Sequence, residues 1–357
     1  MRFRPLGSAI SLGVLCTAPL FASFIPCATT TNCPSSSTVS TSNGNFNSLA
    51  AATVQVWDPI AGTGTANVGT GTIIDARLSG NILQFGVVTA AHVVQGSSTG
   101  IYLGFSDGNG GVTQVTPDDL YVASGGGASA DLSYIGVTYN LATNSELSGN
   151  STLTNMLESI TAAPIGLAPV NPTQAFDFTS YGYGLTAEVN PDSANSSTYP
   201  YVYDSANSSL GYGTLRTFTN SIHFYNSAFS IVDGSTTYTS AVQEFQLLNN
   251  GLGVSGPGDS GSGMFVNGVL EGVIEFGPGG QGFCYNGDCG YTGYQYGNLF
   301  GGVRITSSYL SWLQTQDASY VTAPEPATFV LAGLLIAGLA LARKKQLVPA
   351  PAKSRGK

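Results

Sequence analysis

Residues 256–263 read Gly-Pro-Gly-Asp-Ser-Gly-Ser-Gly. A serine hydroxyl is a weak nucleophile, which needs a base within hydrogen-bond reach and backbone N–H groups aimed at the developing oxyanion. The glycines around Ser260 let the chain turn tightly and let N–H groups face a substrate carbonyl without an intervening Cβ. Ser260 is therefore the candidate nucleophile, and Gly258 and Ser260 are the candidate oxyanion donors. In a chain with 47 glycines, an ordinary glycine-rich turn is the alternative interpretation.

Two other segments hold the partners that such a serine needs. His92, one of 2 histidines, follows the apolar run 85–89 and two alanines, so it is the candidate base. Asp131 stands directly before the apolar stretch 132–137, where a partly buried carboxylate needs a partner such as an imidazole N–H. Taken singly, a structural histidine and a turn-capping aspartate are the alternatives.

The order His, Asp, Ser, with spacings of 39 and 129 residues, resembles the trypsin/chymotrypsin family of serine proteases. The segments 69–74, 87–92, 272–277 and 302–313 are also similar to family segments. The resemblance covers residues 53–315. It implies an all-β fold of two six-stranded antiparallel β-barrels with a short C-terminal helix, within a domain at 51–318 whose halves meet near 140–165. It also implies that Ser260 attacks the peptide carbonyl, His92 carries the proton and Asp131 orients the imidazole.

The chain departs from the family pattern at several positions. Ser262-Gly263 replaces the usual Gly-Pro, and Glu275 stands beside the expected triad where the family has serine. Asp259 corresponds to the residue that often pairs with a new N-terminus after activation cleavage, yet no Ile-Val-Gly-Gly start follows a basic residue. Either activation differs or Asp259 is satisfied internally.

The resemblance also assigns a substrate-binding pocket. Val254 takes the position at its floor, and Gly277 and Gly301 take those at its walls. An apolar floor leaves a buried cation unpaired, so we expect a preference for apolar or aromatic side chains over Lys and Arg.

Strand-like runs separated by turn residues continue from Val54 to Phe276, which suits a barrel or sandwich. Residues 29–50 are expected to be a flexible lead-in, 185–210 a long polar insertion, and 278–300 a surface loop. The pattern of residues 307–313 predicts a short capped helix.

Both ends of the chain carry targeting patterns. Residues 1–28 are typical of a secretory signal peptide, with Arg2 and Arg4 before a short apolar run; a retained anchor is the alternative. Residues 324–326 read Pro-Glu-Pro, and an apolar run and the basic residues 343–345 follow. This resembles a PEP-CTERM sorting signal, which implies export in a Gram-negative bacterium and processing by an exosortase. Residues 319–357 are then linker, transmembrane segment and basic tail; a plain C-terminal anchor is the alternative.

Composition narrows the function classes. The part of the chain between the two terminal segments contains three basic residues (Arg77, Arg216 and Arg304) and 19 acidic ones. Such a surface repels nucleic acid and anionic membrane, so neither is an expected partner. No cofactor is expected, and two histidines without a Cys-x-x-Cys pair argue against a metal site.

Cysteines agree with export. Cys16 lies in the signal, whereas Cys27, Cys33, Cys284 and Cys289 follow, and the last two predict a short-loop disulfide. The partners expected are a protein or peptide substrate and the exosortase. A catalytically inactive surface-attached binding module on the same fold and a structural matrix protein are the competing functions.

Overall fold

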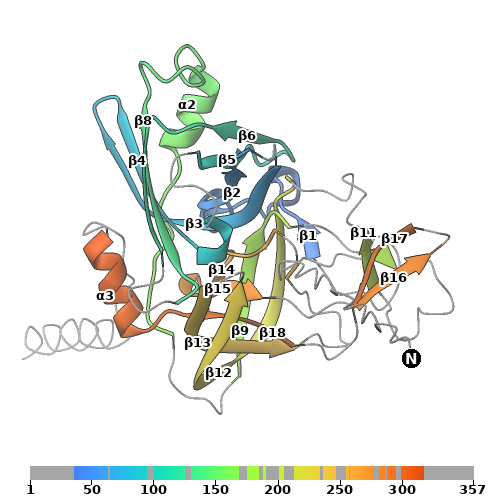
Figure 1. Ribbon diagram of the computed structural model, residues 1–357. Coiled ribbons are helices and arrows are strands. Elements are labelled where there is room, and N and C mark those ends of the chain that lie inside the picture. The colour runs from blue at the N-terminus through green and yellow to red at the C-terminus, as the bar shows by residue number, and fades with distance from the viewer. Residues whose placement is uncertain are drawn as a thin grey trace, which may run out of the picture.

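The computed structural model describes residues 36–62, 65–94, 100–124, 130–168, 175–184, 188–189, 201–204, 213–233, 236–246, 255–256, 258–276, 281–285, 288–294 and 299–316. Two large antiparallel sheets dominate these residues (Figure 1). The first is built from residues 53–140 and the second mainly from residues after 175. The all-β prediction with a short C-terminal helix is therefore confirmed.

The N-terminal sheet has seven strands in the order β6-β5-β2-β3-β4-β8-β7. Its inner face is rich in β-branched and aromatic residues, which suit a buried pleated surface. Phe85, Phe105 and Tyr139 form an aromatic cluster with ring centroids 5.8–6.2 Å apart at its centre. The strands are β2 (Thr53–Ile60), β3 (Thr65–Ser79), β4 (Ile82–Thr89), β5 (Tyr102–Ser106), β6 (Val112–Val115), β7 (Asp119–Ser124) and β8 (Ser133–Asn140).

The C-terminal sheet closes on itself. Its order is β1-β12-β13-β18-β15-β14-β9, and β12 also pairs with β9, so six strands form a ring to which β1 is added. The six strands expected in each half are present in this ring, whereas the N-terminal half has seven. The strands are β1 (Ser36–Thr38), β9 (Ala175–Gly182), β12 (Arg216–Asp233), β13 (Thr236–Gln246), β14 (Gly263–Val266), β15 (Val269–Phe276) and β18 (Leu299–Arg304).

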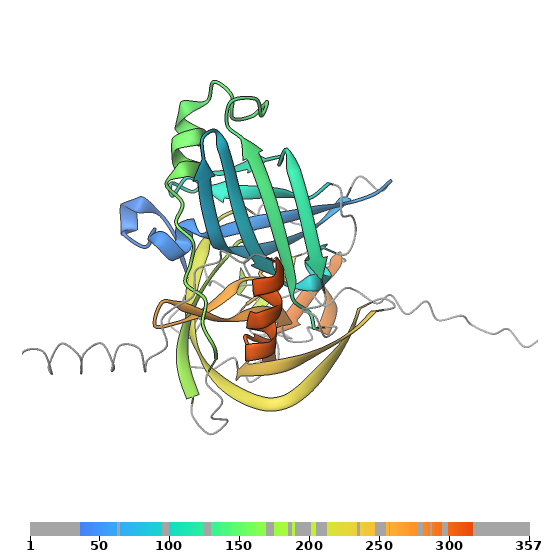
Figure 2. The ribbon, with the colours of Figure 1, turned by 90° about the vertical axis from the view of Figure 1, so that its left-hand side faces the viewer.

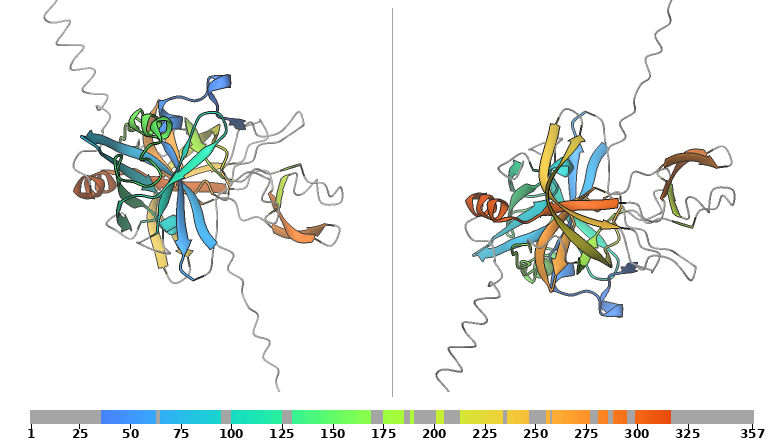
Figure 3. Two further views of the ribbon diagram at one scale, coloured as in Figure 1. Left: turned by 90° about the horizontal axis from the view of Figure 1, so that it is seen from above. Right: turned by 90° about the horizontal axis from the view of Figure 1, so that it is seen from below.

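The two insertions are not simply loops. Parts of 185–210 and 278–300 pair with each other as a four-stranded sheet in the order β10-β11-β17-β16. This sheet stands apart from the two large sheets in Figure 1 and in both views of Figure 3. The sequence failed to predict it because glycine-rich and asparagine-rich segments have low strand propensity. The strands are β10 (Glu188–Val189), β11 (Tyr201–Asp204), β16 (Gln281–Tyr285) and β17 (Asp288–Tyr294).

The expected flexible lead-in is wrong for residues 36–50. Ser36, Ser37 and Thr38 pair with β12, a 3₁₀ turn η1 (Thr41–Asn43) follows, and helix α1 (Ser48–Ala51) leads into β2. The side chain of Asn47 caps α1 by accepting from the N–H groups of Leu49 and Ala50. Short-range capping and long-range pairing thus order a polar segment that lacks strand periodicity.

Two further helices complete the described fold. Helix α2 (Ser151–Glu158) lies between the two sheets in sequence and buries Leu153 and Leu157. Helix α3 (Ser307–Gln316) begins after Thr306, whose Oγ1 accepts from the N–H of Tyr309. It buries Tyr309 and Leu313 where the two large sheets meet (Figure 2). The capped helix predicted at 307–313 is present and three residues longer.

Several sequence predictions lie outside the described residues. These are the signal peptide, the C-terminal apolar run and basic tail, Cys27, Cys33, Val254 and Gly277. None of the helices in the described part of the chain has the length and apolar character needed to cross a bilayer.

Candidate active site

His92 is fixed by a buried carboxylate. It lies in the 3₁₀ turn η2 (Ala91–Val94), directly after β4. Its backbone N–H donates to Oδ1 of Asp131 at 2.7 Å, and its Nδ1 lies 2.6 Å from Oδ2. The Asp131 side chain is fully buried and that of His92 is 9% exposed. With Nδ1–H donating to an ionised carboxylate, Nε2 is the basic nitrogen of the neutral ring.

Ser260 lies in a tight turn that is hydrogen-bonded on two sides. The N–H of Gly261 donates to the carbonyl of Ile274 in β15 at 2.7 Å, and the carbonyl of Ser260 accepts from the N–H of Thr70 in β3 at 2.8 Å. The Thr70 hydroxyl donates to the carbonyl of Gly258 at 2.8 Å. The turn that carries the serine is therefore held between the two halves of the molecule.

Glycine is required at position 261 for two independent reasons. Its φ is +91°, in the region that side chains disfavour. A Cβ there would overlap the Thr70 carbonyl oxygen and the Thr89 hydroxyl, and would lie 3.0 Å from the nitrogen of Ala90. Ala90 stands two residues before His92, so the backbones that carry the candidate nucleophile and base touch.

A second contact brings the same segments together. A Cβ at Gly69 would lie 2.6 Å from both methyl groups of Val93 and 2.9 Å from the carbonyl oxygen of Ser260. Gly69 therefore sits between the residue after His92 and the candidate nucleophile. Ala90 and Val93 both lie within two residues of His92 along the chain, and two residues span at most about 7 Å. Because Asp131 is hydrogen-bonded to His92, all three residues predicted from the sequence lie close together between the two halves.

Asp259 is satisfied internally. Its carboxylate accepts from the N–H of Gly184 at 2.8 Å and from that of Gly256 at 2.9 Å, and the residue is fully buried. A Cβ at Gly184 would overlap this carboxylate. Burial lowers the pKa of Arg216, and the negative charge of Asp259 partly opposes that shift. Of the two alternatives that the sequence left, internal satisfaction is the one that the structure bears out.

Glu275 is buried beside the same turn. It is 2% exposed and occupies the irregularity in β15 between Ile274 and Phe276. The neighbouring Ile274 exchanges backbone hydrogen bonds with Gly261 and Ser262. The Glu275 carboxyl group therefore belongs to the residue directly after Ile274, whose backbone supports the turn of the candidate nucleophile.

The predicted specificity pocket is described only in part. Gly301 is buried in β18, where it pairs with Phe276 and Glu244. Among the residues that the structure describes, no group of three His, Cys, Asp or Glu could hold a metal ion.

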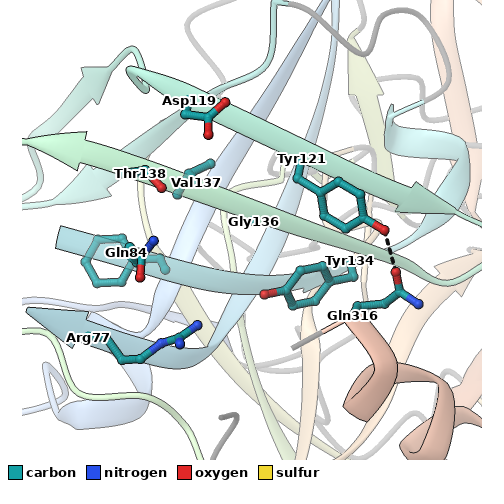
Figure 4. Close-up of a pocket in the computed structure, with 10 residues that line it drawn as sticks. Arg77, Gln84, Asp119, Tyr121, Tyr134, Gly136, Val137, Thr138 and Gln316 are labelled. Carbon is teal, nitrogen blue, oxygen red and sulfur yellow. Dashed lines mark hydrogen bonds between the residues drawn. The ribbon is translucent and has the colours of Figure 1, made fainter. Parts of the chain in front are cut away.

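A pocket that the sequence did not indicate lies on the N-terminal sheet, at β3, β4, β7, β8 and the end of α3 (Figure 4). Its lining includes Arg77, Tyr121, Tyr134 and Gln316. These residues are scattered over 240 positions, so no local motif marks them.

The comparisons with known proteins identify the C-terminal segment. Residues 322–345 match the PEP-CTERM protein-sorting motif, which marks proteins for export and attachment to the cell surface of Gram-negative bacteria. The motif implies processing by an exosortase. The predicted PEP-CTERM resemblance is confirmed. A search of curated proteins finds no match.

Similar solved structures include several serine proteases. The Rv3671c protease of M. tuberculosis in its active form shares 14% identity, covering 91% of this chain and 97% of its own, with a TM-score of 0.40. A thermostable serine protease, AL20, from an extremophilic microorganism shares 13%, covering 76% and 98%, with a TM-score of 0.40. The MamO protease domain of Magnetospirillum magneticum shares 11%, covering 74% and 96%, with a TM-score of 0.38.

Replacing Gly261 by alanine should unfold the turn that carries Ser260. We expect the Gly261→Ala variant to lose about 3 kcal/mol or more of unfolding free energy, because the new methyl group overlaps Thr70 and Thr89. Gly268→Ala is the matched control: its φ is +82°, but nothing lies within 4 Å of the added Cβ. It should lose only about 1–2 kcal/mol from backbone strain. Urea unfolding measures both, and equal losses would contradict the close contact.

Proposed function

We propose that the chain is a secreted serine endopeptidase of the chymotrypsin type, with Ser260 as nucleophile, His92 as general base and Asp131 as its orienter. The observation that carries this proposal is the double hydrogen bond between His92 and Asp131, 39 residues apart, beside the turn that carries Ser260. A buried carboxylate that binds both the backbone and the ring of one histidine fixes its tautomer and its direction. The domain proposed for this activity is 51–318.

The proposed reaction divides peptide hydrolysis into two acyl transfers. The Ser260 hydroxyl attacks the scissile carbonyl carbon while Nε2 of His92 takes its proton. The N–H groups of Gly258 and Ser260 stabilise the negative oxygen that forms. The imidazolium then protonates the leaving amine, and an acyl-enzyme remains on Ser260. Water, deprotonated by His92, releases the second product and restores the hydroxyl.

The backbone conformation of the turn supports this assignment of the oxyanion donors. Gly258 has a φ of +95°, a conformation that only glycine adopts without strain. The N–H groups of Asp259, Gly261 and Ser262 donate to the carbonyls of Gly256, Ile274 and Asp259 respectively. These bonds hold the turn in one conformation, so its geometry is set before substrate binds, which is what electrostatic stabilisation of a transition state requires.

The disulfide predicted between Cys284 and Cys289 remains part of the proposal. The two residues lie on β16 and β17, which are paired neighbours in the small sheet. An oxidising compartment outside the cytoplasm allows such a bond to persist.

Ser260→Ala should abolish labelling by a fluorophosphonate probe and lower kcat on a denatured protein substrate by about 10⁵–10⁶-fold. Ser262→Ala is the matched control, because Ser262 is also buried and lies two residues away in the same turn. It should keep both the labelling and most of the activity. Equal labelling of the two variants would exclude Ser260 as nucleophile.

The same experiment tests the competing function. Burial of the Glu275 carboxyl beside the Ser260 turn favours an inactive binding module on this fold. Under that alternative, the wild-type chain takes no label and cleaves no substrate. Restoration of labelling by Glu275→Ser would then assign the inactivity to this carboxyl group.

We infer that the enzyme needs no activation cleavage, because Asp259 already has internal partners. The active form should therefore keep the residues of β1 and α1, and incubation with trypsin should not raise its activity. N-terminal sequencing of the probe-labelled protein measures this. Asp259→Asn keeps the shape of the side chain, but it weakens one of the two charge-assisted hydrogen bonds and removes the other, because an amide NH2 group cannot accept from a backbone N–H. Each such bond is worth about 1.5–3 kcal/mol, so the variant should show less labelling. A labelled form that begins beyond Ala52 would contradict the inference.

For specificity, we propose that Val254, Gly277 and Gly301 form an open pocket with an apolar floor. Cleavage of a peptide library should then occur after apolar or aromatic residues. Val254→Asp should shift the profile towards Lys and Arg, because a carboxylate would pair with a buried cation. A wild-type profile dominated by Arg at the cut site would refute the assignment.

A further inference from the structure

The pocket on the N-terminal sheet is not used by the proposed peptidase mechanism. It has a volume of about 380 Å³ and opens on the face of β3, β4, β8 and β7 (Figure 4). Ligand pockets commonly range over about 300–1,000 Å³. This one therefore suits a small ligand, or one or two units of a polymer.

Two tyrosines give the pocket its aromatic walls. Tyr121 on β7 is 52% exposed, whereas Tyr134 on β8 is 4% exposed. Their ring centroids lie 6.4 Å apart with an interplanar angle of 56°. Gly136 leaves the space beside them open, since a Cβ there would contact Tyr134 at 3.4 Å and Tyr121 at 3.7 Å. The more exposed ring, that of Tyr121, presents a face that an apolar ligand surface can cover.

Polar groups complete the lining of the pocket. Nε of Arg77 donates to the buried carboxylate of Asp75 at 2.6 Å, which orients the guanidinium at the edge of the pocket. Gln84, Asp119 and Thr138 add an amide, a carboxylate and a hydroxyl to the lining. The lining thus carries one cation and one carboxylate together with neutral hydrogen-bonding groups.

This set of groups discriminates between ligand classes. A purely apolar ligand would desolvate Arg77 and Asp119 without replacing their hydrogen bonds. An anionic ligand would be repelled by Asp119 and attracted by few cations elsewhere in the domain, whereas a cationic ligand would be repelled by Arg77. A neutral polyhydroxyl ligand suits both the polar and the aromatic parts of this lining. Its hydroxyls can bond to the polar side chains, and its C–H face can cover the ring of Tyr121.

The position of the pocket relates it to the point of surface attachment. The Tyr121 hydroxyl donates to Oε1 of Gln316 at 2.6 Å, and Gln316 is the last residue of α3. The sorting motif begins at residue 322, six residues further on. Six extended residues reach at most about 22 Å. The pocket therefore opens near the segment that attaches the chain to the cell surface.

We propose that this pocket binds one or two sugar units of a neutral polysaccharide at the cell surface. The ring of Tyr121 covers the C–H face of a sugar, and Arg77, Gln84 and Asp119 bond to its hydroxyls. The site holds the domain against the polysaccharide independently of peptide cleavage.

Calorimetric titration of the full-length chain with neutral tetrasaccharides (cellotetraose, maltotetraose, mannotetraose and tetra-N-acetylchitotetraose) tests the proposal. The chain is kept in a detergent without a sugar headgroup. At least one tetrasaccharide should bind with a Kd of about 1 mM or below. Tyr121→Ala should raise that Kd about tenfold, because it removes the ring face that covers the sugar.

Two further variants separate binding from folding. Gly136→Val fills the space beside the tyrosines with a residue that favours strands, and should also weaken binding about tenfold. Tyr121→Phe keeps the ring but loses the bond to Gln316, and should bind within about threefold of wild type. Tyr102→Ala, on β5 outside the pocket, is the control and should leave the Kd unchanged.

Three outcomes would overturn the proposal. The first is that no tetrasaccharide binds the wild-type chain. The second is that Tyr121→Ala and Gly136→Val, shown to be folded by circular dichroism, bind as tightly as wild type. The third is that an oligoarginine peptide binds in place of the sugars and loses affinity in both variants, which would make the pocket a site for basic peptides.

Discussion

Thr70 joins the two halves of the molecule at the turn that carries Ser260, and the candidate site depends on its hydrogen bonds. It is fully buried. Its N–H donates to the carbonyl of Ser260, its hydroxyl donates to the carbonyl of Gly258 and accepts from the N–H of Tyr183, and its carbonyl accepts from the hydroxyl of Thr89. A buried backbone group without a partner is costly, so these bonds allow few alternative positions for the turn. The position of Ser260 relative to η2 follows from the same bonds.

Two fully buried carboxylates stand on either side of this junction, and each is satisfied by groups of the chain itself. Asp131 belongs to the N-terminal half and binds His92, whereas Asp259 belongs to the C-terminal half and binds two backbone N–H groups. Buried charges are stable only when they are paired and hydrogen-bonded. The two carboxylates therefore bind the segments around the candidate site rigidly, one on each side.

The sequence predicted those features that depend on local pattern. The strand runs, the capped C-terminal helix and the three candidate site residues each have a short motif or a period that can be read locally. Features that arise from pairing between distant segments were missed. The pairing of Ser36 with Phe218 orders the lead-in, and that of Tyr201 with Tyr294 makes a sheet from two apparent loops. The sequence also could not show that Gly184 and Gly256 are the partners of Asp259. Every residue except proline has a backbone N–H, so no residue type marks such a donor.

The place of β18 in the C-terminal ring sets the order of events during export. β18 lies between β13 and β15, so neither neighbour has its full set of ladder hydrogen bonds until residues 299–304 have been delivered. The sorting motif begins only 18 residues after Arg304. A chain threaded from its N-terminus therefore completes this ring when almost all of it has crossed the membrane and only α3 and the sorting segment still follow. Assembly of the C-terminal half and arrival of the sorting signal are thus nearly simultaneous.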